Sequence, residues 1–355
     1  MTLGNAMAEA ADPPIVGEVR ANHRFDEAAL EAWLLENVEG LEGPMRLRQF
    51  HGGASNPTFY IAAGGRRYVM RKKPPGHLLA SAHQVDREYR VMKALGPTGF
   101  PVPVMRALCQ DDGVIGTAFY VMDYKEGRIF RDARLPGVEP AERAAIYDEL
   151  NAVLARLHGV DYAAIGLADY GRPGNYFTRQ IDRWTKQYRG AETEPIEAME
   201  RLIAELPARI PRDDVTTIAH GDYRLENVMF HPTEPRLIAV LDWELSTLGH
   251  PLADVGYNCL LWHSVSEGWG SLTGVDFATS GIPTQDAYVA AYCRRTGRER
   301  IDDLNFLIGF AAFRLASIGQ GVFKRNLDGI GTGNATRDNT GTRVLAELAL
   351  KLIES

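Results

Sequence analysis

The stretch HGDYRLENVMF, residues 220–230, places several polar side chains ahead of a short apolar run. Asn227 follows Asp222 by five positions, and a second apolar run, LIAVLDW, includes Asp242 near its end. We expect two strands joined by the turn PTEP, which would bring Asp242 back beside Asp222. Carboxylate and amide oxygens suit a hard cation such as Mg²⁺. A carboxylate base followed by two metal-binding oxygens at this spacing is the arrangement that phosphoryl transfer uses.

Two other interpretations of this stretch are open. Asp and Asn residues in loops most often cap turns with their side chains. Alternatively, His220, Asp222 and His231 could ligate a transition metal in a hydrolase, although no third histidine lies at helical ligand spacing.

A phosphotransferase would need to hold its nucleotide with the part of the chain that precedes these residues. The loop HGGASNPTF lies between two strand-like segments. Its glycines, Gly52 and Gly53, permit a tight turn whose main-chain amides could approach phosphate oxygens. Taken alone, this loop is equally compatible with an ordinary hairpin.

Glu88 is the stronger indication of a nucleotide site. On its predicted helix it shares a face with apolar residues, so its carboxylate points toward the sheet. A buried carboxylate needs a cationic partner, and the strand YVMRKK offers Arg71 or Lys73. We favour Arg71, because Lys73 lies next to Pro74, where the strand should end. Such a pair positions nucleotide phosphates in kinases, and an ordinary structural salt bridge is the alternative.

The composition is that of a globular chain with reduced cysteines. Of the 355 residues, 45% are hydrophobic and 24% are charged, which allows a sizeable core. The net charge of −7 argues against nucleic acid as a main partner. Three separated cysteines without a CxxC pair are typical of the cytoplasm. The N-terminus lacks a signal-peptide pattern, and the longest apolar run, FLIGFAAF, is shorter than the roughly 20 residues that span a bilayer.

The predicted elements divide the chain into an α+β part and a mostly helical part. We expect about five antiparallel strands and one crossing helix in the first 120-odd residues, with a hairpin at Gly64–Gly65. Helices dominate after the hinge expected near Asp123–Gly127, and the cleft between the two lobes is the expected site. The expected boundaries are a mobile tail over 1–15, a first lobe over 16–124 and a second lobe over 125–355.

Together these segments resemble the aminoglycoside phosphotransferase-like kinases, which share the bilobal protein-kinase-like fold. The resemblance is carried, in the family's order, by GGASNPT, YVMRKKPPG, REYRVMKAL, AFYVMDYKEG, HGDYRLEN and LDWELSTLGHPLADVGY. These segments lie between about residues 50 and 260, and the later part matches only as helices. Within the group, the chain is most similar to the branch found as the kinase-like domain of certain acyl-CoA dehydrogenases and as stand-alone bacterial proteins.

The resemblance implies a role for each matched residue. Asp222 would be the catalytic base, and Asn227 and Asp242 would bind Mg²⁺. His220 would orient the catalytic loop, and Asp254 would anchor its region. The ATP-binding residues would be Gly52, Gly53, Ser55, Asn56, Arg71, Glu88, and, at the adenine, Met122 and Tyr124.

Departures from eukaryotic protein kinases favour a small-molecule acceptor. Gly221 stands where those kinases have arginine, Trp243 follows Asp242 in place of Phe-Gly, and no activation-loop segment follows. Arg71 replaces the usual lysine, which leaves Arg71 and Lys73 as alternatives for the phosphate contact. We expect an ATP-dependent small-molecule kinase, with a non-catalytic nucleotide-binding pseudokinase as the second hypothesis. The sequence distinguishes neither ATP from GTP nor one oligomeric state from another.

A basic segment in the helical part favours an anionic acceptor. RPGNYFTRQIDRWTKQYR has five cationic side chains against one aspartate, and Arg179, Arg183 and Lys186 would share a helix face. Aminoglycosides are polycations, so their site should be rich in carboxylates. The branch resemblance suggests a hydroxyacyl-CoA, whose phosphates Arg179 and Arg183 could clamp. The alternatives are a solvated basic helix face and a hydroxylated antibiotic, such as an aminoglycoside, as acceptor.

Overall fold

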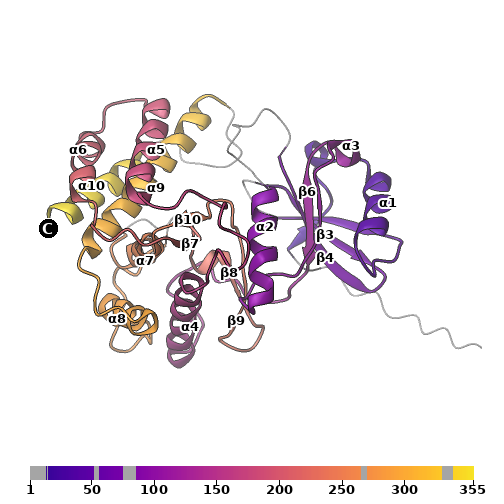
Figure 1. Ribbon diagram of the computed structural model, residues 1–355, viewed down its shortest axis with the longest axis horizontal. Coiled ribbons are helices and arrows are strands. Elements are labelled where there is room, and N and C mark those ends of the chain that lie inside the picture. Colours follow the sequence, from indigo (N-terminus) through magenta and orange to yellow (C-terminus); the bar gives the residue numbers. More distant parts are fainter. Residues whose placement is uncertain (1–12, 14, 52–55, 75–84, 265–269, 330–338) are drawn as a thin grey trace, which may run out of the picture. The chain divides into compact units, whose positions relative to one another are not determined.

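The computed structural model describes residues 13, 15–51, 56–74, 85–264, 270–329 and 339–355. The chain forms two compact units that divide between Glu126 and Gly127, within the segment expected to be a hinge. Most of the predicted N-terminal tail lies outside the described residues, as do Gly52, Gly53 and Ser55. Figure 1 labels the helices and strands of both units.

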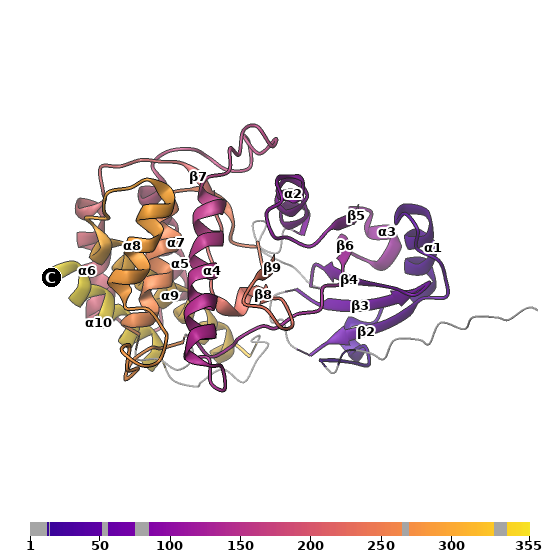
Figure 2. The ribbon, with the colours of Figure 1, turned by 90° about the horizontal axis from the view of Figure 1, so that it is seen from below.

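The first unit is built on a six-stranded antiparallel sheet (Figure 2). Its strands, in the spatial order β1-β2-β3-β4-β6-β5, are β1 Val16–Gly17, β2 Arg46–Phe50, β3 Thr58–Ala63, β4 Arg66–Lys72, β6 Phe119–Asp123 and β5 Met105–Cys109. Gly64 and Gly65 both have positive φ and form the hairpin between β3 and β4, which confirms the turn predicted from the Gly-Gly pair.

Each face of this sheet is covered by a helix. On one face, helix α1 (Glu27–Asn37) packs Leu30 and Leu34 into a core with Phe59 and Phe119 of the strands. Helix α2 (Val85–Leu95) contacts β5 and β6. Because side chains alternate along a strand, Arg71 faces away from the α1 core that its neighbour Met70 enters. The short elements of this unit are η1 Ala21–His23, η2 Gly96–Thr98 and α3 Asp112–Ile115.

The second unit is mainly helical and carries two short antiparallel strand pairs. Its longer helices are α4 Pro140–His158, α5 Tyr176–Ala191, α6 Glu197–Glu205, α7 Pro251–Cys259, α8 Gln285–Thr296, α9 Leu304–Leu327 and α10 Thr340–Glu354. The strand pairs are β7 Thr217–Ala219 with β10 Thr247–Gly249, and β8 Val228–Phe230 with β9 Leu237–Val240. Short η segments are η3 Leu206–Arg209, η4 Leu225–Asn227 and η5 Leu260–Trp262.

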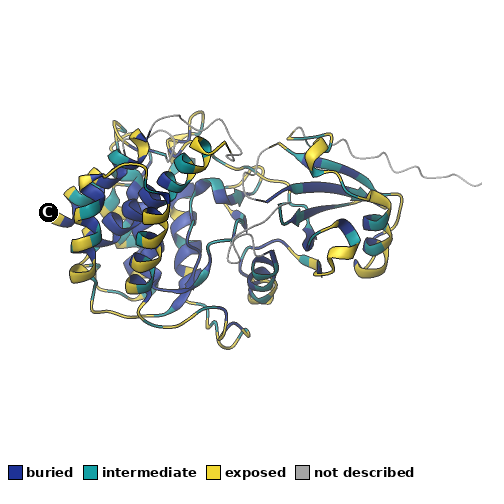
Figure 3. Cartoon of the chain, turned by 90° about the horizontal axis from the view of Figure 1, so that it is seen from above, coloured by how far each residue is buried: buried dark blue, intermediate teal, exposed yellow. Residues whose placement is uncertain are grey.

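Helix α9 is the core helix of the second unit and packs against α5, α7 and α10. It extends the predicted apolar run to 24 residues, so by length and composition alone it could cross a membrane. However, 72% of its most apolar window is buried inside the unit, which is the usual situation of a core helix. In both units the buried residues lie mainly on the inner faces of helices and sheet (Figure 3).

Candidate active site

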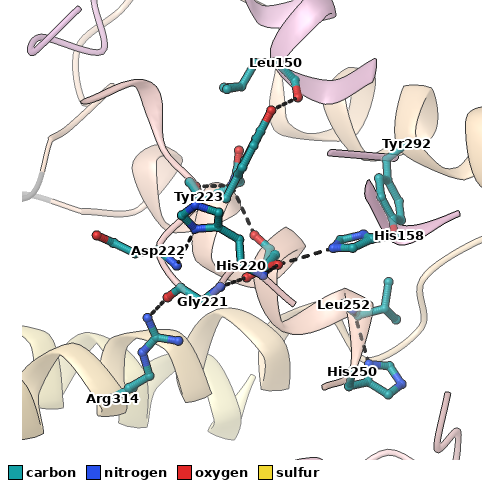
Figure 4. Close-up of polar contacts among 12 residues, drawn as sticks. Leu150, His158, His220, Gly221, Asp222, Tyr223, His250, Leu252, Tyr292 and Arg314 are labelled. Carbon is teal, nitrogen blue, oxygen red and sulfur yellow. Dashed lines mark hydrogen bonds and ion pairs between the residues drawn. The ribbon is translucent and has the colours of Figure 1, made fainter. Parts of the chain in front are cut away.

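The loop that follows β7 is anchored through its main chain. Asp254 of α7 accepts hydrogen bonds from the N–H groups of His220 at 2.7 Å and Gly221 at 2.8 Å (Figure 4). His158 lies 3.3 Å from the same carboxylate. Burial opposes the charged form of Asp254, but the hydrogen bond from His158, the charges of His158 and His220 and the Gly221 N–H together outweigh it, and the pKa of Asp254 is lowered. This geometry fits the anchoring role expected for Asp254.

Gly221 follows a path that other residues rarely adopt. Its φ is +81°, and an added Cβ would lie 2.7 Å from the carbonyl oxygen of Leu245. Arg314 of α9 donates a hydrogen bond to the carbonyl oxygen of Gly221. The turn ahead of Asp222 is therefore held from α7 on its N–H side and from α9 on its carbonyl side.

His220 is fully buried and uses both ring nitrogens within the loop. Its Nδ1 accepts from the N–H of Asp222 at 3.2 Å, and its Nε2 lies 3.0 Å from the carbonyl oxygen of Leu241. This network selects the neutral ring protonated at Nε2, and burial lowers the pKa of His220 accordingly. The ring therefore fixes the loop to the strand β9 side, as expected for an orienting histidine.

The same contacts contradict the transition-metal alternative. No ring nitrogen of His220 remains for a metal, and His231 lies past the opposite end of β8, where its Nδ1 accepts from the N–H of Thr233. Among the described residues there is no cluster of three or more histidine, cysteine or acidic side chains able to hold a metal ion.

Asp222 is held on both carboxylate oxygens yet stays partly accessible. Asn227 donates from Nδ2 to Oδ2 of Asp222 at 2.6 Å and to its carbonyl oxygen at 2.8 Å. The hydroxyl of Tyr257 donates to Oδ1 at 2.5 Å, and Arg224 lies 3.6 Å from the same oxygen. The side chain of Asp222 retains 20% exposure, so a substrate hydroxyl could reach it.

The predicted hairpin is formed by β8 and β9, and it brings the residue before Asp242 beside Asn227. The strands pair Val228 with Val240, and the N–H of Leu241 donates to the carbonyl oxygen of Asn227 at 2.8 Å. Asp242 itself has φ +60°, a conformation that is uncommon outside glycine and often marks functional sites.

Asn227 and Asp242, here called the Asn227–Asp242 corner, carry the donor atoms that Mg²⁺ prefers. The side-chain amide nitrogen of Asn227 donates to Asp222, so its side-chain carbonyl oxygen is the atom that remains to bind a cation. Asp242 adds a carboxylate. Burial disfavours the charged form of Arg224, but the negative charges of Asp222 and Asp242 contribute to raising its pKa. The Asn227–Asp242 corner thus offers only oxygen donors and carries negative charge, which fits a hard cation.

The first unit contains the predicted pair of Glu88 and Arg71. Their Oε2 and Nε atoms lie 3.4 Å apart, and the Glu88 side chain is 1% exposed. Asn56 donates to Oε1 of Glu88 and the Tyr120 hydroxyl donates to Oε2, each at 3.1 Å. The prediction that Arg71 pairs with Glu88 is confirmed, and Asn56 proves to be a third member of the cluster.

The expected adenine contacts are restricted by the sheet. The N–H of Tyr124 already donates to the carbonyl oxygen of Arg67 at 3.0 Å, and the N–H of Asp123 donates to Val104 at 2.9 Å. The Tyr124 ring packs edge-on against Tyr60, with centroids 5.4 Å apart. Tyr124 could therefore meet a base through its ring or carbonyl oxygen, but not through its N–H group. Met122 is buried at 9% exposure.

The two arginines expected to bind substrate differ in their surroundings. Arg179 donates to the carbonyl oxygen of Arg172 at 2.5 Å. Arg183 lies 5.2 Å from the Trp184 ring centroid, and Arg314 lies 5.9 Å from the same centroid. Burial by surrounding atoms, together with the nearby charge of Arg314, lowers the pKa of Arg183.

The contacts that Tyr257 and Arg314 make with the loop of Asp222 were not predicted from the sequence. Tyr257 belongs to the matched segment PLADVGY, but nothing in its spacing indicates contact with Asp222. Arg314 gives a clearer signal, because it interrupts the apolar run FLIGFAAFRLA. A cation in such a run is buried only where a polar group is present to bind it.

Comparison with known proteins agrees with this geometry. A profile of the phosphotransferase enzyme family matches residues 46–304. The chain belongs to that family. It is 48% identical over 343 residues to acyl-CoA dehydrogenase family member 10 of Mus musculus, covering 95% of this chain but 32% of the relative. The chain spans less than half the length of the curated relatives that it resembles.

Solved structures place the fold of this family member. A protein from Ralstonia eutropha JMP134, named as an aminoglycoside phosphotransferase, is 51% identical, with a TM-score of 0.85 over 93% of this chain and 99% of that one. A ternary complex of an aminoglycoside phosphotransferase with ADP and hygromycin B has a TM-score of 0.60 at 14% identity, covering 91% and 98% of the two chains. The fold is therefore α+β and protein-kinase-like.

Proposed function

We propose that this phosphotransferase is an ATP- and Mg²⁺-dependent kinase for a hydroxyl group of a small molecule, with a hydroxyacyl-CoA as the first candidate acceptor. The observation that carries the proposal is Asp222, a partly exposed carboxylate held on both oxygens beside the oxygen donors of Asn227 and Asp242. Such a group can take a proton from an acceptor at a fixed position.

In the proposed reaction, Asp222 accepts the proton of the acceptor hydroxyl. The hydroxyl oxygen forms a bond to the γ-phosphorus of ATP, and the bond from that phosphorus to the β–γ bridging oxygen breaks, so ADP leaves. Asn227 and Asp242 would hold Mg²⁺, which neutralises charge on the phosphates. Arg71, kept in place by Glu88, would contact phosphate oxygens from the first unit.

Two observations support an anionic acceptor. The chain resembles acyl-CoA dehydrogenase family members more closely than the hygromycin-binding enzyme. The guanidinium groups of Arg183 and Arg314 lie 5.2 and 5.9 Å from the Trp184 ring centroid, and no ion pair to either is found in the described part of the chain. A polycationic aminoglycoside would meet repulsion there, whereas phosphate groups would be attracted.

We also propose a cytoplasmic location. The three cysteines are free and buried, as is usual in a reducing compartment.

The test is a paired acceptor assay with purified protein, ATP and Mg²⁺. One arm contains 3- and 4-hydroxyacyl-CoA thioesters, and the other contains kanamycin-type aminoglycosides; phosphorylated product is detected by mass spectrometry. We expect product only in the thioester arm, and Asp222→Asn should slow its formation by about 10²–10⁴-fold, the usual contribution of a positioned base.

The outcomes of this assay separate the hypotheses. Product in the aminoglycoside arm alone would refute the anionic acceptor but keep the kinase. MgATP binding without turnover of any hydroxyl compound would favour the pseudokinase. Equal rates for wild type and Asp222→Asn would remove Asp222 from its role as base. Repeating the productive arm with GTP decides the nucleotide preference.

A further inference from the structure

A tyrosine from a different part of the chain contacts the proposed base directly. The Tyr257 hydroxyl donates to Oδ1 of Asp222 at 2.5 Å, across 35 positions of sequence. Asn227 donates to the other oxygen, Oδ2. With one donor on each oxygen, the carboxylate cannot turn about its Cβ–Cγ bond without losing a hydrogen bond to a charged group.

Tyr257 can act only as a donor in this position. The residue is 6% exposed, and burial, followed by the negative charge of Asp222, raises the pKa of its phenol far above the ordinary value. Its proton therefore stays on the hydroxyl at neutral pH. Tyr257 supplies direction to the carboxylate but takes no proton from it.

The surroundings of Tyr257 keep its ring in place. The Arg314 guanidinium lies 5.3 Å from the ring centroid, and the same guanidinium donates to the carbonyl oxygen of Gly221. Tyr257 also follows Asp254 by three positions on α7, which places the two side chains on neighbouring positions of one helix face. The same helix thus places Asp254 against the main chain of the loop and Tyr257 against the carboxylate of Asp222.

We propose that Tyr257 is a positioning residue that fixes the direction of the Asp222 carboxylate toward the acceptor. The inference rests on the proposed role of Asp222 as base. Removing the hydroxyl should leave nucleotide binding intact, since the hydrogen bond of the Tyr257 hydroxyl goes to Asp222. It should instead slow the transfer step.

The test compares Tyr257→Phe with Tyr147→Phe, a matched loss of one buried hydroxyl. Tyr147 is 0% exposed and donates to the carbonyl oxygen of Ala133 at 2.6 Å, so its variant controls for the general cost of that loss. The assay measures hydrolysis of MgATP with water as acceptor, which requires no knowledge of the natural acceptor. Melting temperatures of both variants are measured alongside.

We expect Tyr257→Phe to lower kcat by about 10- to 100-fold, the rate equivalent of one hydrogen bond to a charged group. The KM for MgATP should stay within about twofold of wild type. A loss in kcat without a change in KM is expected of a residue that orients the base, and a general loss of folding would not give this split. Tyr147→Phe should leave kcat unchanged. Unchanged kcat in Tyr257→Phe would overturn the proposal.

A second readout does not depend on activity. A short hydrogen bond from a buried hydroxyl to a carboxylate should give a downfield proton NMR signal. We expect this signal in wild type and Tyr147→Phe, and its loss in both Tyr257→Phe and Asp222→Asn. A wild type that gives this pattern, but neither hydrolyses MgATP nor phosphorylates any acceptor in the paired assay, would refute the kinase function and keep the contact. Persistence of every downfield signal in Tyr257→Phe would refute the contact itself.

Discussion

Asp242 shows how neighbouring residues maintain an unusual backbone conformation at the proposed metal corner. Its left-handed φ of +60° costs free energy on the order of 1 kcal/mol or more, so the surroundings must impose it. Trp243 follows it, is 1% exposed, donates from Nε1 to the carbonyl oxygen of Val240 at 3.0 Å, and packs its ring against His220. The buried side chain of Trp243 thus helps to hold Asp242 in this conformation.

Replacing Asp242 with asparagine should therefore remove the negative charge while keeping the backbone conformation. Asparagine tolerates the left-handed region, so the fold should survive, while the lost charge weakens Mg²⁺ binding. We expect Asp242→Asn to reduce the affinity for MgADP by about 10-fold or more, equivalent to about 1.4 kcal/mol, with little change for ADP in EDTA. Calorimetry with and without Mg²⁺ measures both, and exposed Asp276→Asn is the control. Equal MgADP affinity in wild type and variant would contradict the assignment.

At the residue scale, spacing was informative for side chains that lie near one another in sequence. Asp222 and Asn227 are five positions apart, and a hairpin brings Asp242 to them, so local rules suffice. Tyr257 and Arg314 act on the same loop from 35 and 93 positions away. Their contacts depend on how α7 and α9 pack, which periodicity does not determine.

Helix α2 and strand β4 illustrate what could be predicted at the scale of elements. Glu88 on the apolar face of a helix required a cation, and the strand supplied Arg71. The sequence did not predict that Asn56 and Tyr120 would complete the cluster, because both reach Glu88 from strands or loops 32 positions away. The sequence also did not reveal that the N–H of Tyr124 donates a hydrogen bond within the sheet.

Loss of Glu88 should affect both the stability of the first unit and its proposed function. Glu88→Ala leaves the half-buried Arg71 without its carboxylate, and breaking a buried pair from one side costs about 3–5 kcal/mol. We expect a lower melting temperature and a higher KM for ATP. Glu88→Gln should lower the melting temperature and raise the KM for ATP by less, because glutamine still accepts hydrogen bonds. Asp86→Ala, on the same helix but half-buried, is the control. Wild-type values for Glu88→Ala in both assays would refute the structural role.

At the scale of the whole molecule, the change from mixed to helical character located the division of the chain. The two units divide between Glu126 and Gly127. The family match explains why this worked, since the ordered set of motifs specifies a protein-kinase-like fold. The helices after residue 260 were predicted as helices only; their packing around α9 follows from side-chain complementarity that a single sequence does not display.

The stability of the folded chain should fall in mild acid, and His250 should be a main cause. His250 caps α7 by accepting from the N–H of Leu252, is 1% exposed, and has its pKa lowered to about 4 by burial, against opposing charge from Asp213. The unfolded chain, with a histidine pKa near 6.5, then binds the proton more readily. Stability is therefore lost as the pH falls from about 6.5 to about 4, by about 2 kcal/mol at pH 5.

Urea unfolding at pH 7.5 and pH 5 checks this expectation. His250→Asn keeps a capping side chain but cannot titrate, so its loss of stability between the two pH values should be smaller than that of wild type by about 2 kcal/mol. His220 has a lowered pKa of the same sign and remains in the variant, so some dependence on pH should persist. An identical loss in both proteins would contradict the role of His250.

The backbone conformation at Gly221 explains why a glycine follows His220, whichever acceptor is phosphorylated. With φ at +81° and the Leu245 carbonyl oxygen 2.7 Å from the place of a Cβ, no other residue fits without moving that carbonyl. The glycine is therefore a requirement of the local main chain and carries no information about the molecule that is phosphorylated. Kinases that differ at this position can share a preference for acceptors, and evidence on that preference must come from residues that contact the acceptor, a role that we propose for Arg183.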